Sequence, residues 1–206
     1  MQTAITQSVP SHSLSESLQK FAATIPGKIT VGLAATAVVA AAAHVAIPLP
    51  FTPVPFILTP LAVLGVGLAL GPVASFFTML AYLAEGVAGL PVFSPMGPGG
   101  LAHLLGPNGG FLMAYPLVAA IVGFLTQKLS TRVPRFLAAT IGGTAAIAVL
   151  FLCGAAWFMQ FAGHSLHTTW IGAVAPFLPG EAIKILAAAG IYSTLVRAKA
   201  SKSAQN

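Results

Sequence analysis

The sequence contains no aspartate and only three glutamates, and just 6% of its 206 residues are charged. An ordinary soluble domain carries about 25% charged residues. Because 57% of the residues are hydrophobic, the chain cannot form the polar shell that water requires. The shortage of charge therefore excludes an ordinary soluble fold. It predicts one compact domain with lipid as its outer solvent.

The same shortage narrows the chemistry that the chain can perform. Three carboxylates, Glu16, Glu85 and Glu181, largely exclude a carboxylate-rich catalytic or metal site. The single cysteine, Cys153, excludes an intrachain disulfide framework. The basic residues form no stripe interleaved with aromatics, which argues against a nucleic-acid partner, and no phosphate-binding loop is present. We therefore expect a protein that is not an enzyme and has no cofactor or metal.

Apolar runs separated by proline and glycine clusters predict six transmembrane helices. The runs cover 29–47, 56–70, 73–90, 110–126, 136–160 and 182–196. Gly71-Pro72 separates the second run from the third, because one continuous helix would overshoot a hydrocarbon core of about 30 Å. The predicted fold is therefore all-α, with a cytoplasmic N-terminal segment 1–28, one six-helix membrane domain 29–197 and a cytoplasmic tail 198–206.

The basic residues predict how the helices are oriented. The outer connections 48–55, 91–109 and 161–181 contain no Lys or Arg, as the positive-inside rule requires if both termini are cytoplasmic. We expect a multi-pass protein of the cytoplasmic (inner) membrane. The outer connections are also the long ones, so a functional site is expected to open outward. Eight of the nine basic residues would lie inside: Lys20, Lys28, Lys128, Arg132, Arg135, Arg197, Lys199 and Lys202.

Lys184 is the only basic residue within an apolar run, and Glu181 precedes it by three positions. On a helix that spacing puts both side chains on one face, where they can share one ligand. A lysine near the bilayer centre costs about 2.5–3.5 kcal/mol, so an intramembrane charge is a functional candidate. The alternative is that Glu181 suits the positive end of a helix dipole while Lys184 extends to the outer surface.

Other polar side chains near the outer side leave two interpretations open. Glu85 and His44 either face the same cavity or reach the membrane interface. His164 and His167 have a metal-like spacing in an outer connection, but no acidic or cysteine ligand lies near them in sequence. A metal site there is therefore not expected.

Small residues form a smooth face on the first predicted helix. Ala37 and Ala41 are four positions apart, a spacing that lets another helix approach closely. The face could dock a partner protein, or it could pack inside the same chain.

Five segments together carry a family resemblance. They are Pro-Phe-Thr-Pro-Val-Pro at 50–55, Gly-Leu-Pro-Val-Phe at 89–93, Gly-Gly-Leu at 99–101, Leu-Gly-Pro-Asn-Gly-Gly at 105–110 and Pro-Gly-Glu-Ala-Ile-Lys at 179–184. In the order and spacing of these segments the chain resembles the BioY family, from about the first helix to the end of the sixth. The family consists of biotin-binding S components of energy-coupling factor (ECF) vitamin transporters. Its last motif usually has Asp where this chain has Glu181.

The resemblance implies a cavity near the outer surface that captures biotin under the loops after helices one, three and five. Biotin presents a carboxylate, an apolar ring system and a ureido group. We expect Lys184 to pair with the carboxylate or donate to another ligand oxygen, and Glu181 to accept from ureido N–H groups. Asn108 would offer both a donor and an acceptor. Phe51, Phe93 and Tyr115 would supply apolar walls and one hydroxyl.

The resemblance also implies partners. The Ala37/Ala41 face would dock on a membrane coupling subunit bound to two ATPases, so that ATP is used only by partner subunits. Some members of the family are thought to work without these partners, and the sequence leaves that open. Two alternatives remain beside biotin uptake: an S component for another vitamin, and a membrane enzyme acting on lipid.

Overall fold

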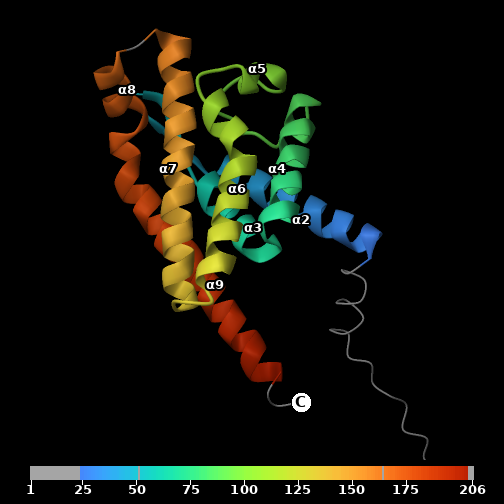
Figure 1. Ribbon diagram of the computed structural model, residues 1–206. Coiled ribbons are helices and arrows are strands. Elements are labelled where there is room, and N and C mark those ends of the chain that lie inside the picture. The colour runs from blue at the N-terminus through green and yellow to red at the C-terminus, as the bar shows by residue number, and fades with distance from the viewer. Residues whose placement is uncertain (1–23, 51, 164, 204–206) are drawn as a thin grey trace, which may run out of the picture.

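The computed structural model describes residues 24–203, apart from 51 and 164. It is mostly helical, with one small β-hairpin (Figure 1). The helices are α2 (Ile25–His44), α3 (Thr59–Leu70), α4 (Pro72–Val87), α5 (Leu101–Leu104), α6 (Gly109–Leu129), α7 (Arg135–Ala162), α8 (Leu166–Ala173) and α9 (Leu178–Ser203), with a 3₁₀ turn η1 (Ala175–Phe177). The strands are β1 (Ala46–Leu49) and β2 (Thr52–Ile57).

The six predicted runs overlap α2, α3, α4, α6, α7 and α9, but the first run extends into β1 and the second begins in β2. Helix α9 differs most from its predicted bounds, since it begins at 178 instead of 182 and ends at 203 instead of 196. Its last turns carry Arg197 and Lys199, so they are helical without being apolar. Hydrophobicity alone therefore marked only the central part of this helix.

Four helical segments of the described chain are long and apolar enough to cross a membrane. They are α2, α6, α7 and the stretch Leu166–Ser201, which includes most of α9. Helices α3 and α4 are apolar but have only 12 and 16 residues. Large apolar side chains such as Leu152, Val73 and Ile183 are exposed, as expected where lipid surrounds a helix bundle. The chain is therefore a mostly helical membrane protein.

Helix α6 lies at the centre of the bundle and contacts α3, α4 and α7 (Figure 1). Helix α9 packs on α7 and α3, and α2 lies at the edge, against α3 and α4. Between α3 and α4, Gly71 adopts a φ of 76° and its N–H donates to Gly67. A side chain would disfavour that left-handed conformation, which explains the sharp turn expected at Gly71-Pro72.

The β-hairpin corrects the all-α prediction. Strand β1 pairs antiparallel with β2, with Ala46 opposite Ile57. The proline-rich connection contains Pro48 within β1 and Pro53 and Pro55 within β2. Proline cannot continue a helix, but it is tolerated on edge strands, and both strands of a two-stranded sheet are edges. The predicted outer connections also contain α5, α8 and η1, which are too short to show a helical pattern in the sequence.

The two ends of the bundle differ. Helices α5 and α8 lie at one end, and the α6–α7 turn and the end of α9 lie at the other (Figure 1). The first end holds the long connections without Lys or Arg, and the second holds basic residues such as Lys128, Arg132 and Arg197. The site described next lies at the first end.

Candidate functional site

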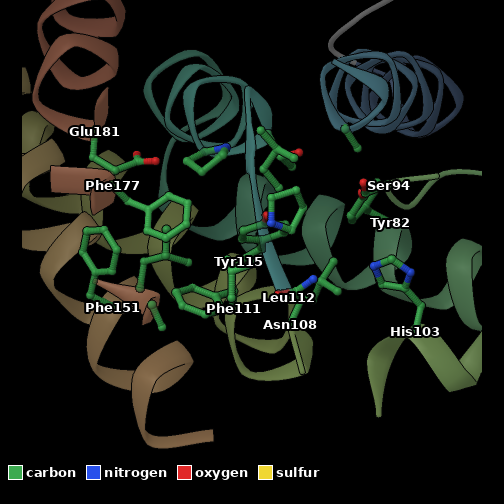
Figure 2. A pocket seen from close by; sticks show the side chains of 18 residues that line it. Tyr82, Ser94, His103, Asn108, Phe111, Leu112, Tyr115, Phe151, Phe177 and Glu181 are labelled. Carbon is green, nitrogen blue, oxygen red and sulfur yellow. The ribbon is translucent and has the colours of Figure 1, made fainter. Parts of the chain in front are cut away.

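A cavity opens among the first turns of α3 and α9, the first two turns of α6, the second half of α4, the middle of α7 and the connections at the same end (Figure 2). Most of its lining is apolar or aromatic, from residues such as Phe111, Phe151 and Phe177. A few polar groups interrupt this wall, which is the usual character of a small-molecule site. They are Thr59, Tyr82, Ser94, His103, Asn108, Tyr115 and Glu181.

The cavity is small, with a volume of about 60 Å³. Sites for drug-sized ligands usually have about 300–1,000 Å³. A ligand with two fused rings and a side chain can therefore enter only if part of the wall moves. The hairpin β1–β2 contributes Val54 to the lining, and the connection 88–108 contributes Ser94 and His103. Both segments lie outside the long helices, so they are the parts of the wall that we expect to move.

Glu181 and Lys184 form a buried ion pair on α9. Lys184 Nζ donates to Glu181 Oε1 at 2.6 Å and to the backbone oxygen of Ile57 at 2.6 Å. It also lies 4.1 Å from the centre of the Phe56 ring, a cation–π contact. Two of its three N–H groups therefore donate to described acceptors, and the Phe56 ring packs against the same ammonium group.

The two members of the pair face different surroundings. Glu181 lines the cavity, and its second oxygen, Oε2, is buried without a hydrogen-bond partner among the described residues. Lys184 is 4% exposed and does not line the cavity. The geometry thus gives Glu181 a free acceptor toward a ligand. Lys184 orients and neutralises that carboxylate and makes no contact with the cavity.

The motif at 179–184 explains this arrangement locally. Pro179 lies in the first turn of α9, where its missing N–H is not needed. At Gly180 a Cβ atom would overlap the Phe56 ring, so only glycine lets that ring lie against α9. Glu181 then falls in the first turn, where the helix dipole favours a negative charge.

Asn108 lies directly before α6 and lines the cavity. Its side chain does not cap the helix, and its Oδ1 is buried without a hydrogen-bond partner in the described part of the chain. Trp157 Nε1 donates to the backbone oxygen of Gly106 at 2.8 Å, which fixes the preceding turn on α7. The amide is therefore held at the cavity with an acceptor still free, as the sequence interpretation requires.

The expected aromatic residues separate into two groups. Tyr115 is fully buried and lines the cavity, next to Tyr82 at 6.4 Å between ring centres. Phe93 does not line the cavity; it packs edge-on against Tyr82 at 5.5 Å. Phe93 thus supports the wall from behind. Phe51 lies outside the described residues.

The remaining polar candidates are not at the cavity. Glu85 Oε1 accepts a hydrogen bond from Thr36 on α2 at 3.0 Å, so this carboxylate joins two helices. His44 is exposed, with Nδ1 2.8 Å from the backbone oxygen of Ala40. His167 is exposed on α8, and His164 lies outside the described residues.

Ala37 and Ala41 are both exposed on α2. They therefore do not pack against any other part of the chain that the structure describes. Leu33 and Val38 on the same helix are 53% and 60% exposed. Helix α2 thus leaves a small-residue surface uncovered, which favours the docking interpretation.

Sequence reasoning missed Ser94 and His103, which line the cavity from the connection between α4 and α6. His103 is 5% exposed and its ring packs on Phe93 at 5.4 Å between centres. A single histidine in a glycine-rich segment has no periodic pattern that would identify it. The available signal was its position between the two glycine motifs at 99–101 and 105–110.

Comparison with known proteins gives concordant matches. The model of the BioY family matches residues 14–201. The biotin transporter BioY of Rhizobium etli is 36% identical over 151 residues, which are 69% of this chain and 78% of the relative. The biotin transporter BioY of Rhodobacter capsulatus is 33% identical over 176 residues, 81% of this chain and 91% of the relative.

A solved structure has a similar fold. It is the crystal structure of the S-component for biotin from an ECF-type ABC transporter, with a TM-score of 0.75 and 26% sequence identity. The match covers 90% of this chain and 94% of the other.

Proposed function

This chain belongs to the BioY family, and from that premise we propose that it takes up biotin as the substrate-capture (S) component of an ECF-type transporter. The protein is a transport subunit and not an enzyme. This function is supported by a biotin transporter that matches this chain over most of its own length and by the similar fold of a solved S-component for biotin. The observation in this chain that carries it is the cavity at the end of the bundle with α5 and α8, where Glu181 Oε2 has no hydrogen-bond partner among the described residues.

In the proposed site, Glu181 accepts hydrogen bonds from the ureido N–H groups of biotin through Oε2. Asn108 contributes its free oxygen and its amide donors to the same ligand. The bicyclic ring lies against Tyr115 and neighbouring aromatic side chains. Lys184 holds the Glu181 carboxylate in place through the hydrogen bond from Nζ to Oε1.

The proposed topology has six transmembrane helices with both termini in the cytoplasm. Helices α3 and α4 would be the short spans, surrounded mainly by protein and joined by the turn at Gly71. The absence of Lys and Arg from the three outer connections supports this orientation. The proposed location is the cytoplasmic (inner) membrane.

The proposed partners are an ECF coupling subunit in the membrane and two ATPases. The uncovered Ala37/Ala41 face of α2 would contact the coupling subunit. This chain itself would need no cofactor, because ATP would be hydrolysed only by the partners. Whether uptake also proceeds without them is a separate question for a transport assay.

Equilibrium binding to the purified full-length protein in detergent tests the ligand. We expect saturable binding of radiolabelled biotin at one molecule per chain. Excess unlabelled biotin should displace the label, whereas excess thiamine or riboflavin should not. Binding of another vitamin without binding of biotin would make the chain an S component of different specificity.

A further inference from the structure

The imidazole of His103 is held at the cavity in a fixed orientation. Its Nδ1 lies 2.8 Å from the backbone oxygen of Pro98. Because a carbonyl oxygen can only accept, Nδ1 is the donor in this contact and carries a hydrogen. The ring packs on Phe93, and Nε2 makes no hydrogen bond to any described residue. His103 thus offers one free ring nitrogen to the cavity that it lines.

The α9 side of the cavity is unsuited to a ligand carboxylate. Glu181 presents the free oxygen Oε2 there, and a second carboxylate beside it would be repelled. Lys184 does not compensate, because it does not line the cavity and its ammonium is engaged with Glu181, Ile57 and the Phe56 ring. A ligand with N–H donors at one end and a carboxylate at the other is therefore bound with its donors toward Glu181.

The carboxylate then lies toward the opposite side, where Figure 2 shows Ser94, Tyr82 and His103 away from Glu181. Ser94 Oγ accepts from the Met96 N–H at 3.3 Å, so its O–H remains free to donate. Tyr82 already donates its O–H to the backbone oxygen of Val92 at 2.9 Å. Of the lining residues, His103 alone can become a cation.

We propose that the carboxylate of biotin binds at His103, with the proton on Nε2 donated to the ligand and Ser94 O–H as a second donor. This inference rests on the proposed function. Since Nδ1 already donates to Pro98, Nε2 can donate only when the ring is protonated. Capture of the anionic ligand is therefore coupled to uptake of one proton by His103 wherever the empty site holds a neutral ring.

Few other titratable groups act on this ring. The helices packed against α5 are α4 and α6. Helix α4 carries Tyr82 and Glu85, and Glu85 is hydrogen-bonded to Thr36 and does not line the cavity. Helix α6 carries Tyr115 at the cavity and Lys128 in its last turn, at the far end of the helix. Neither helix supplies a cation that could replace His103.

The test compares biotin with its uncharged carboxamide, biotinamide, for binding to the full-length protein in detergent. We expect the wild type to bind biotin about tenfold or more tightly than biotinamide near pH 6, as for a charge-assisted hydrogen bond. That preference should shrink as the pH is raised, because a ring that carries hydrogen only on Nδ1 cannot donate from Nε2. Calorimetry in buffers of different ionisation enthalpy near pH 8 should report proton uptake with biotin and none with biotinamide.

Variants of His103 separate a ligand contact from a packing role. His103→Ala should remove the preference for biotin over biotinamide. His103→Gln retains a neutral donor of similar reach, so it should keep part of the preference and lose its pH dependence. His44→Ala, which changes an exposed histidine, is the matched control and should behave as the wild type.

The outcomes separate this inference from the proposed function. If the wild type binds biotin but both His103 variants keep the full, pH-dependent preference, His103 is a packing residue and the inference is wrong. It is equally wrong if Lys184→Met removes the preference instead. If the wild type binds no biotin, the proposed function fails and this inference fails with it.

Discussion

Glu181 and Lys184 show how a buried ion pair can serve orientation more than stability. The pair is almost fully removed from solvent, and desolvation of two charges offsets much of their attraction. What the pair achieves is a carboxylate fixed at the cavity with one oxygen free. The Lys184 contacts to Ile57 and Phe56 also attach α9 to strand β2.

Replacement of Lys184 by Met tests its positioning role. We expect Lys184→Met to weaken biotin and biotinamide equally, by about tenfold or more, because Glu181 loses its orientation. Breaking a buried pair should also destabilise the protein by about 3–5 kcal/mol, which thermal unfolding in detergent can measure. Weaker binding of biotin alone, with biotinamide unaffected, would instead indicate direct contact between Lys184 and the ligand carboxylate.

Gly180 permits the contact between Phe56 and Lys184. Gly180→Ala would place a methyl group where the Phe56 ring lies, so we expect the ring to shift and biotin affinity to fall by about 1–3 kcal/mol, as for overpacking. Gly190→Ala is the matched control on the same helix, since no atom lies within 4 Å of its added Cβ. Binding isotherms for both variants check the prediction. Equal biotin affinity of Gly180→Ala and Gly190→Ala would show that biotin binding does not depend on the position of the Phe56 ring.

The sequence predicted the residues whose types are rare in a membrane protein. A lysine and a glutamate three positions apart in an apolar run are conspicuous in the sequence itself, because intramembrane charges are expensive. The sequence could not predict that Glu181 faces the cavity while Lys184 orients it. These roles depend on Ile57 and Phe56, which approach α9 only in the folded chain. His103 was missed for the same reason: Phe93 and Pro98 give its ring a fixed direction through tertiary contacts.

At the scale of elements, helices α2, α3, α4, α6, α7 and α9 were predictable because each has a continuous apolar run. The hairpin was not, because prolines at 48, 53 and 55 indicate only that a helix is interrupted. The pairing of the two extended segments depends on the helices against which they fold. So does their position over the cavity, which they line with Val54 and Pro55. Helix α5 has four residues, which is too short for a periodic signal.

The Ala37/Ala41 face of α2 can be tested as the site of partner binding. Ala41→Phe should prevent association with the coupling subunit, because a bulky side chain on a small-residue face keeps helices apart. Biotin binding by the isolated protein should remain unchanged. Co-purification with the coupling subunit and ATPases measures the first effect, and Leu152→Phe, on the exposed side of α7, is the control. Normal assembly of Ala41→Phe would mean that the partner docks elsewhere.

At the scale of the whole molecule, the bundle separates two tasks. The cavity lies at the end that carries α5, α8 and the hairpin, and the small-residue face lies along α2 at the edge. The proposed ligand site and the proposed docking face therefore use different residues. The small cavity volume of about 60 Å³ implies that segments at the ligand-binding end move when biotin enters.

Labelling of single cysteines tests the proposed orientation. In a Cys153→Ser background, we expect a membrane-impermeant maleimide added to intact cells to label His167→Cys but not Thr131→Cys. Both positions are exposed in the structure, and the positive-inside rule assigns them to opposite sides. Disruption of the cells should make Thr131→Cys reactive. Labelling of Thr131→Cys in intact cells would reverse the topology.

We propose that this cavity captures biotin through the free oxygen of Glu181. The most direct measurement is the biotin dissociation constant of Glu181→Gln beside that of Glu85→Gln, which changes a carboxylate away from the cavity. We predict that Glu181→Gln weakens biotin by about 1.5–3 kcal/mol, the usual contribution of a hydrogen bond to a charged group, while Glu85→Gln binds as the wild type does. Unchanged affinity in Glu181→Gln, in a protein that still binds biotin, would contradict the account.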